Sequence, residues 1–167
     1  MQRETDELVA WLDRHGGALV LFARQWVGSQ ADAEDVVQEA FVGFWRSRNR
    51  VGDAVAYLYR CVRHAALGWL RSRRRRLRRE RIAGRDGMAS PERDLFSPLE
   101  NEEEMARIQT AMERLPTTQR EVLVLHIWGE LTFAQIAAVL AVSPNTAGSR
   151  YRYALASLRR QLAGNGG

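Results

Sequence analysis

The sequence lacks lysine entirely and contains a single cysteine, Cys61. One cysteine excludes an internal disulfide and a cysteine-based metal cluster. No apolar run approaches the ~20 residues that a membrane-spanning helix needs, and the charged N-terminus MQRETDELVAWLDRHGG has no secretory hydrophobic segment. Strand-like alternation of useful length is also missing. These absences predict an all-α, cytoplasmic protein without membrane insertion, bound metal or other cofactor.

The 25 basic residues are all arginine, and the formal net charge is +5. Residues 1–85 carry 17 arginines and 10 acidic residues, residues 86–113 carry 2 and 8, and residues 114–167 carry 6 and 2. Two basic blocks therefore flank an acidic one. Arginine binds phosphate bidentately and stacks on bases, which favours a nucleic-acid partner, although genomic base composition alone also produces uniform arginine usage.

The segment from Thr132 to Leu162 predicts two helices joined by a tight turn. Thr132 and Gln135 have the spacing of a capping box for the first helix. Ser143 and Pro144 suit the N-cap and first position of the second helix. Such a pair fits a helix-turn-helix, whose second helix enters the DNA major groove; the alternative is an ordinary helical hairpin with a solvated arginine face. The polar residues early on the second helix are Asn145, Ser149, Arg150 and Arg152.

The segment ADAEDVVQEAFVGFWRSR predicts a helix with an acidic ridge opposite its apolar stripe, preceded by a capping signature at Ser29. Asp32, Asp35 and Glu39 recur at i, i+3 and i+7, with Gln38 beside them. The helix dipole favours acids in the first turn, but Glu39 lies two turns in. The ridge suits a positively charged protein partner, and a solvated helix face is the alternative.

Residues 54–70 predict another long helix, which runs into the arginine-rich segment 71–81. Eight of these eleven residues are arginine, so a helix through them cannot pack in a core. A solvated or disordered tail is one interpretation. Aromatic residues beside arginines are what unstacked bases need, so nucleic-acid contact is the interpretation we favour.

The remaining segments complete a prediction of two small helical domains joined by a flexible acidic linker. The domains span residues 1–83 and 105–167, and the linker spans residues 84–104. We expect the first helix to stop near Gly16–Gly17 and a second to end at Gly28. In the second domain, Thr118 and Glu121 have the spacing of a further capping box.

Three stretches resemble bacterial RNA polymerase sigma factors of the sigma-70 superfamily, specifically the small extracytoplasmic-function type. They are DAEDVVQEAFVGFW (32–45), YLYRCVRHAALGWLRSRRRR (57–76) and LPTTQREVLVLHIWGELTFAQIAAVLAVSPNTAGSR (115–150). Their order and spacing cover nearly the whole chain. The resemblance implies a first domain similar to sigma region 2 and a second similar to region 4.

The resemblance assigns a role to each set of residues. The region 2.2 positions, which would bind the coiled coil of the largest polymerase subunit, are Asp35, Gln38 and Glu39. The region 2.3 and 2.4 positions, which would melt and read the −10 promoter element, are Tyr57, Tyr59, Arg60, Arg63, His64, Arg71, Arg73, Arg74, Arg75 and Arg76. The region 4.2 positions, which would read the −35 element, are Asn145, Ser149, Arg150 and Arg152.

The chain departs from the family pattern at several of these sites. The family often has Asn at the position of His64 and Asp or Asn at the position of Gly68. A basic residue is usual at Gly148 and frequent at Tyr153 and Leu155. The −35 contact is therefore expected to hold fewer base-specific arginines and to depend more on DNA shape.

Together these features predict a non-catalytic subunit that binds core RNA polymerase and directs promoter recognition, DNA opening and transcription initiation. Its partners would be core polymerase and promoter DNA, and small sigma factors of this kind are often held inactive by an anti-sigma factor. The alternative is a helix-turn-helix regulator that does not enter polymerase. A nuclease would need carboxylates that converge on two metal ions, whereas Asp32, Asp35 and Glu39 lie along one helix, so we do not expect an enzyme.

Overall fold

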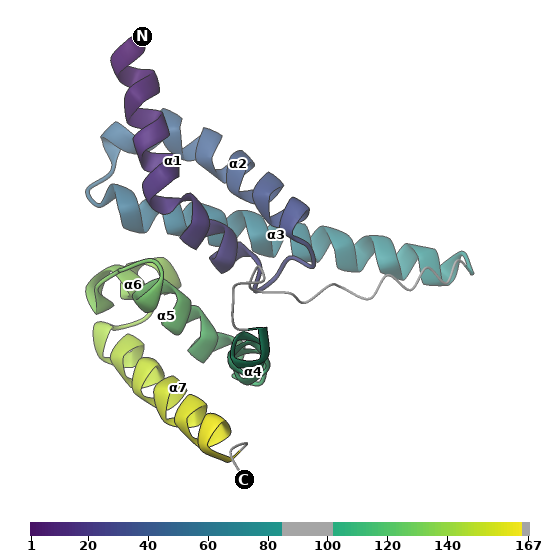
Figure 1. Ribbon diagram of the computed structural model, residues 1–167. Coiled ribbons are helices and arrows are strands. Elements are labelled where there is room, and N and C mark those ends of the chain that lie inside the picture. Colours follow the sequence, from purple (N-terminus) through teal and green to yellow (C-terminus); the bar gives the residue numbers. More distant parts are fainter. Residues whose placement is uncertain (85–101, 165–167) are drawn as a thin grey trace.

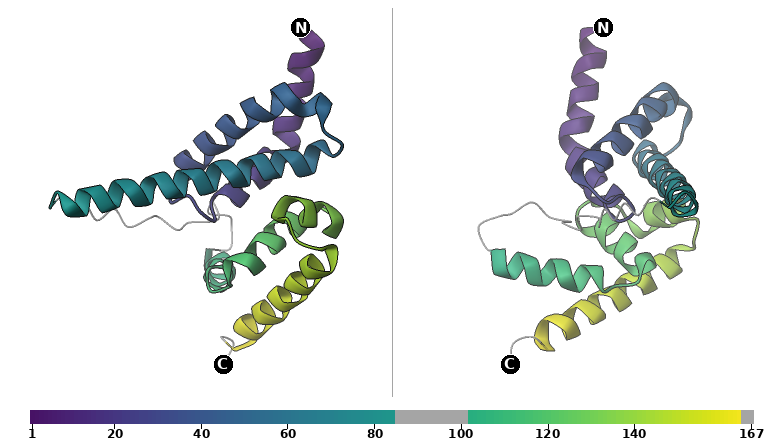
Figure 2. Two further views of the ribbon diagram at one scale, coloured as in Figure 1. Left: turned by 180° about the vertical axis from the view of Figure 1, so that it is seen from behind. Right: turned by 90° about the vertical axis from the view of Figure 1, so that its right-hand side faces the viewer.

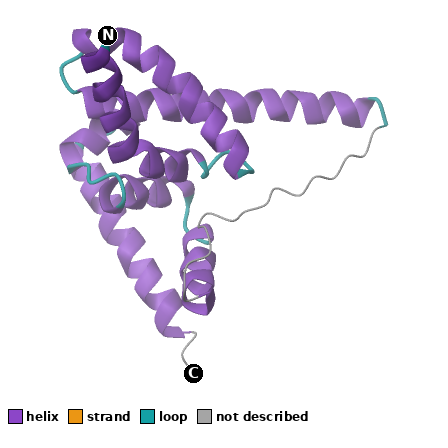
Figure 3. Cartoon of the chain, turned by 45° about the horizontal axis from the view of Figure 1, so that its top comes forward, coloured by secondary structure: helices purple, strands orange, loops and turns teal. Residues whose placement is uncertain are grey.

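The computed structural model describes residues 1–84 and 102–164, and these residues are almost entirely helical (Figures 1 and 3). The first domain consists of α1 (Gln2–Ala23), α2 (Gln30–Ser47), a 3-10 turn η1 (Arg48–Arg50) and α3 (Ala54–Ile82). The second consists of α4 (Glu102–Glu113), α5 (Thr117–Ile127), α6 (Phe133–Leu140) and α7 (Pro144–Gly164). No strand occurs in the described ranges, and the prediction of an all-α fold with two helical domains is confirmed.

The first domain is a bundle in which α1 and α2 both pack on the first half of α3. Its core is aromatic: the ring centroids of Trp11 and Phe44 lie 5.2 Å apart, and those of Phe22 and Tyr59 lie 5.8 Å apart. Such pairs add to the free energy gained from burial alone. Leu19 and Phe22 are completely buried, so the C-terminal half of α1 is fixed against the other two helices.

The predicted break near Gly16–Gly17 is wrong, because α1 continues through both glycines to Ala23. Each glycine inside a helix costs about 1 kcal/mol relative to alanine. Leu8 and Trp11 before the glycines and Leu19 after them all pack on the same core. Tertiary packing on both sides therefore outweighs the local cost.

Helix α3 begins at Asp53, whose Oδ1 accepts a hydrogen bond from the Ala56 amide at 3.0 Å. Its last completely buried residue is Ala66, and the helix continues to Ile82 through the arginine-rich segment. This second half projects beyond α1 and α2 (Figures 1 and 2). The segment is thus an ordered, mostly exposed helix rather than a tail.

The helix-turn-helix is formed by α6 and α7. Both bonds of the predicted capping box between Thr132 and Gln135 are present, and the Ser143 Oγ accepts from the Thr146 amide at 3.0 Å. Between the helices, Ala141 adopts a left-handed conformation with φ 55°, which ends α6 sharply. The predicted helix-turn-helix and its caps are confirmed.

The predicted capping box of Thr118 and Glu121 is wrong. Helix α5 begins at Thr117, after Pro116, and has no side-chain cap. Glu121 is instead buried, with 3% of its surface exposed. It lies within a run of five consecutive buried residues, 121–125, which covers more than a full turn of the helix. The middle of α5 is therefore covered on all sides, as is typical of a helix enclosed by other elements.

Part of that cover comes from the first domain, because the two domains share one continuous core. Helix α1 packs against α5, and α3 packs against α6; the right-hand view of Figure 2 shows the domains stacked on each other. Most of the predicted linker lies outside the described residues. Residues 102–104, which the linker prediction included, are already helical in α4.

Candidate polymerase and nucleic-acid interfaces

The acidic ridge of α2 faces solvent. Asp35, Gln38 and Glu39 are all exposed, while the opposite side of the helix is buried in the first domain. Asp32 has a local role: its amide donates to the Ser29 Oγ at 3.1 Å, and the Ser29 hydroxyl donates to the Asp32 carboxylate at 2.8 Å. The ridge that a partner protein can reach therefore begins at Asp35.

An apolar residue, Val42, extends this ridge and was not among the residues predicted from the sequence. Its side chain is 55% exposed and follows Glu39 at i+3 and Asp35 at i+7, so all three lie on one helix face. Apolar surface rimmed by charges is typical of a protein–protein contact. The helical spacing from Asp35 was the signal that could have identified it.

One largely exposed stripe of α3 carries many of the predicted −10 residues. Spacings of three and four place them on one face of the helix. Arg60, His64, Arg71 and Arg75 are exposed. Tyr57 is half-buried, with its ring centroid 6.1 Å from that of Phe44. The stripe thus presents two rings, those of Tyr57 and His64, and several arginines along a single line.

Tyr59 lies on the opposite face of α3 and requires a correction. Its side chain is completely buried, its ring packs on Phe22, and burial raises the pKa of its hydroxyl well above the usual value. In this arrangement the side chain cannot reach DNA. The prediction of a −10 contact by Tyr59 is replaced by a role in the core, because the aromatic position coincides with the buried side of the helix.

We expect Tyr59→Phe to stabilise the protein by about 1 kcal/mol without weakening promoter binding. The Tyr59 hydroxyl is buried and makes no hydrogen bond within the described residues, and a buried polar group without a partner costs about 1–3 kcal/mol. Urea unfolding measures the first effect and promoter binding by the holoenzyme measures the second. Loss of promoter binding with unchanged stability would instead return Tyr59 to the DNA interface.

Arg63 also lies on the face of α3 directed toward the second domain. Its Nη2 is 3.5 Å from the Glu121 Oε1, and its guanidinium lies 6.0 Å from the centre of the Trp26 ring. Desolvation raises the pKa of Glu121, and the positive charge of Arg63 opposes that effect. Glu121 is a functional candidate that we missed in the sequence; an acidic residue beside the apolar run VLVL was the available signal.

The projecting half of α3 carries the arginine cluster. Arg74, Arg75 and Arg76 are exposed, and the Arg73 guanidinium lies 5.3 Å from the centre of the Trp69 ring, in the range of a cation–π contact. These side chains point in several directions around the helix. A continuous cationic rod of this kind can follow a phosphate backbone.

On the recognition helix α7, the predicted −35 residues divide between two directions. Asn145, Ser149 and Arg152 share one face at i, i+4 and i+7, and the Arg152 Nη2 donates to the Ser149 Oγ at 3.0 Å. Tyr153, beside them, is 66% exposed. Arg150 is half-buried and interacts electrostatically with Glu121.

A ring cluster fixes α7 against the rest of the second domain. The His126 ring stacks on Phe133 with centroids 4.7 Å apart and meets the edge of Tyr151 at 4.6 Å. The His126 Nδ1 lies 2.9 Å from the Leu131 carbonyl oxygen, which can only accept, so Nδ1 carries the hydrogen. One side chain from each of α5, α6 and α7 thereby orients the recognition helix.

Residues 1–84 and 102–164 contain neither a metal-binding cluster nor a membrane-spanning helix. No three or more His, Cys, Asp and Glu side chains come close enough to bind a metal ion there. Within the same ranges, no helix has both the length and the apolar character needed to cross a bilayer.

The chain matches two domains of a known protein family. Residues 11–76 match sigma-70 region 2, and residues 105–158 match sigma-70 region 4. The RNA polymerase sigma-E factor of Streptomyces coelicolor is 30% identical over 149 residues, covering 87% of this chain and 80% of that protein. The ECF sigma factor SigL of Mycobacterium tuberculosis is 29% identical over 157 residues, covering 92% and 87%.

Two solved structures have a similar fold. RpoE, from a complex with the anti-sigma factor NepR of Bartonella quintana, matches with a TM-score of 0.68 at 21% identity, over 99% of both chains. CnrH, from a complex with the cytosolic domain of CnrY, matches with a TM-score of 0.64 at 25% identity, over 96% of this chain and 90% of CnrH. These matches define a two-domain protein with sigma regions 2 and 4. The chain belongs to the extracytoplasmic-function group of sigma-70 RNA polymerase sigma factors.

Proposed function

We propose that the protein binds core RNA polymerase through α2 and recognises promoter DNA through α3 and α7. The observation that carries the proposal is the separation of three surfaces on three helices, each exposed and each different in chemistry. The polymerase contact is formed by Asp35, Gln38 and Glu39, with Val42 adding apolar area. In this scheme the protein acts in the cytoplasm and has no catalytic activity of its own.

The −10 element is contacted by the outward stripe of α3. Opening DNA requires a base that is held out of the stack, and such a base is bound by stacking and hydrogen bonds. Tyr57 and His64 provide the rings, and Arg60 and Arg71 provide phosphate contacts on the same face. Arg73 to Arg76 continue along the backbone. Arg63 joins this set when its contact with Glu121 is released.

The −35 element is contacted by Asn145, Ser149 and Arg152 on the leading face of α7. Asn and Arg reach base edges in the major groove, and the arginine–serine hydrogen bond preorients the Arg152 guanidinium. Few cations lie on this face, which supports a substantial contribution from DNA shape. Arg150 contributes from the side of the helix.

The domain assignment is part of the proposal: residues 1–83 as the region 2 domain, residues 84–104 as the connection and residues 105–167 as the region 4 domain. We also propose an anti-sigma partner, because the solved neighbour RpoE was captured in a complex with the anti-sigma factor NepR. A regulator that uses only its helix-turn-helix would need neither the exposed ridge of α2 nor the cationic rod of α3, so this alternative is not favoured.

Transcription in vitro tests the proposal. We expect core RNA polymerase with this protein to initiate at defined start sites on genomic templates, and core polymerase alone to produce no such starts. Alignment of the sequences upstream of these starts then gives the two promoter elements. Defined start sites that do not depend on the added protein, or their absence altogether, would contradict the proposed function.

A further inference from the structure

Gly148 lies in the second turn of the recognition helix α7 and is buried, although Arg152 one turn further along is exposed. Glycine is among the least favourable residues in the interior of a helix. The backbone at this position is helical, so its conformation does not require glycine. A reason for glycine here therefore has to come from the groups that surround it.

Two side chains enclose the place that a side chain at position 148 would take. A Cβ at Gly148 would lie 3.6 Å from the Arg152 Nη1 and 4.0 Å from the Phe133 Cδ2. Both are ordinary van der Waals distances, so a single methyl group fits. Atoms beyond that methyl group would have to displace either the guanidinium or the ring.

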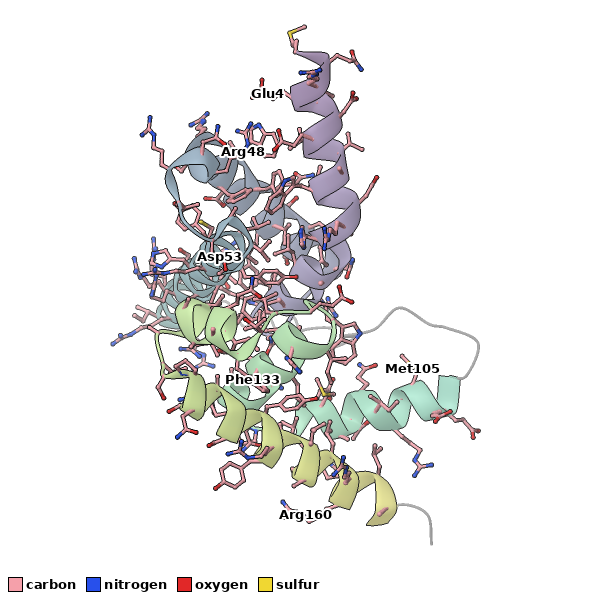
Figure 4. All side chains as sticks on the ribbon, turned by 90° about the vertical axis from the view of Figure 1, so that its left-hand side faces the viewer. Glu4, Arg48, Asp53, Met105, Phe133 and Arg160 are labelled. Carbon is pink, nitrogen blue, oxygen red and sulfur yellow. The ribbon has the colours of Figure 1, made fainter. Side chains whose placement is uncertain are left out.

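The Phe133 ring is the fixed side of this space. It stacks on His126 with centroids 4.7 Å apart and lies 5.5 Å from the Tyr151 ring, and it lies against α7 (Figure 4). Close-packed rings transmit strain to their neighbours and do not yield easily. A longer side chain at position 148 would therefore displace the Arg152 guanidinium and leave the ring in place.

The Arg152 guanidinium is oriented by a hydrogen bond to the preceding turn. Its Nη2 donates to the Ser149 Oγ at 3.0 Å. Arg152 follows Gly148 at i+4 and Ser149 at i+3, and side chains on a helix lean toward its N-terminus. The charge is thus carried about one turn, or about 5 Å, closer to the start of α7 than the Arg152 backbone.

This location suits contact with a base. The N-terminal residues of a recognition helix are those that meet base edges in the major groove, and Asn145 lies one further turn along the same face as Ser149. Several N–H donors of the guanidinium remain available after the bond to Ser149. An arginine held in one orientation can therefore donate two hydrogen bonds to the O6 and N7 atoms of a guanine.

We propose that Gly148 determines the base specificity of α7 by leaving room for the Arg152 guanidinium, which reads one guanine of the −35 element from its place beside Ser149. This inference rests on the proposed function. Gly148 acts through Arg152 and does not itself contact the base, so it is a positioning residue. A longer side chain at this position removes the preference for guanine at one base pair and leaves the other contacts of α7 in place.

Gly148→Gln tests the proposal. Glutamine takes the place of the guanidinium, and it favours a helix more than glycine does, so urea unfolding should show a folded domain. Base preference is measured by selecting promoters that the holoenzyme binds from a library with a fixed −10 element and a randomised −35 element. We expect the wild type to prefer guanine at one position by about 5-fold to 100-fold, the discrimination of one bidentate contact. Gly148→Gln should lose most of this preference, at that position only.

Two further variants identify the residues through which Gly148 acts. Arg152→Ala should erase the guanine preference at the same base pair. Combining it with Gly148→Gln should have no additional effect there, because both changes remove the same interaction. Ser149→Ala should reduce the preference at that base pair about fivefold, the effect of losing one hydrogen bond.

Two control variants separate this effect from other changes in the helix. Gly148→Ala adds a methyl group, which fits beside the guanidinium, and should keep the guanine preference. Ala156→Gln adds the same side chain as the test variant at an exposed position of α7. Because Ala156 lies one turn C-terminal to Arg152, whereas the guanidinium lies on the N-terminal side, this control should select the same sequences as the wild type.

A folded Gly148→Gln protein that selects wild-type sequences would overturn the proposal, as would a Ser149→Ala protein with an unchanged preference. Changes by Gly148→Gln and Arg152→Ala at different base pairs would also overturn it. A uniform loss of affinity in both variants would mean that Arg152 contacts a phosphate and not a base. Wild-type holoenzyme that selects no −35 sequence contradicts the proposed function itself, whereas a −35 preference that does not depend on Gly148 refutes only its positioning role.

Discussion

Replacing both Asp35 and Glu39 with arginine is expected to abolish binding to core RNA polymerase while leaving the fold intact. Both side chains are exposed and make no contribution to the core, so stability should change little. A partner that is complementary to the ridge is positively charged. Two reversed charges at such an interface cost several kcal/mol, which corresponds to a loss of more than about 100-fold in affinity.

The matched control is Asp6→Arg with Asp13→Arg. Both residues are exposed acids, and the net charge changes by the same amount, but both lie on α1 and neither belongs to α2. Titration of labelled core polymerase should give near wild-type affinity for this control. Equal loss in both double variants would mean that overall charge matters rather than the ridge, and wild-type affinity in both would remove α2 from the polymerase interface.

Local sequence signals predicted those features of the fold that depend on neighbouring residues. The caps at Ser29, Thr132 and Ser143 form as expected, because a side-chain oxygen needs only the amide three residues away. The break near Gly16–Gly17 failed because packing on both sides offsets the cost of glycine. The Thr118–Glu121 box failed because α5 begins at Thr117, which places Thr118 inside the helix, and because Glu121 is buried.

The residues of the candidate site also fall into two groups: those predictable from helical periodicity, and those placed by contacts between distant parts of the chain. The ridge of α2 and the leading face of α7 follow from helical periodicity alone, and their residues are where that period places them. The burial of Tyr59 depends on Phe22 and on the second domain. Likewise, Arg63 and Glu121 are 58 residues apart in the chain. No pattern within one helix indicates a contact at that separation.

Replacing Arg73 to Arg76 with alanine is expected to weaken binding to every promoter to a similar extent and to reduce its salt dependence. Alanine preserves the helix, so the change removes charge and the Arg73–Trp69 contact but not the backbone. Each phosphate contact contributes about 0.7 to the slope of log affinity against log salt on single strands and about 0.9 on duplex. If all four arginines contact phosphates, their loss therefore reduces the magnitude of this slope by about 3.

Holoenzyme binding to several promoters over a range of salt concentrations measures this slope. The control replaces Arg3, Arg14, Arg114 and Arg160, which are exposed elsewhere on the molecule, and should leave the slope nearly unchanged. A loss confined to one promoter sequence would show that the cluster reads bases. The salt slope measures counterion release, which scales with the number of phosphates bound. A uniform loss of affinity with an unchanged slope would therefore show that the projecting half of α3 acts through its shape and not through its charge.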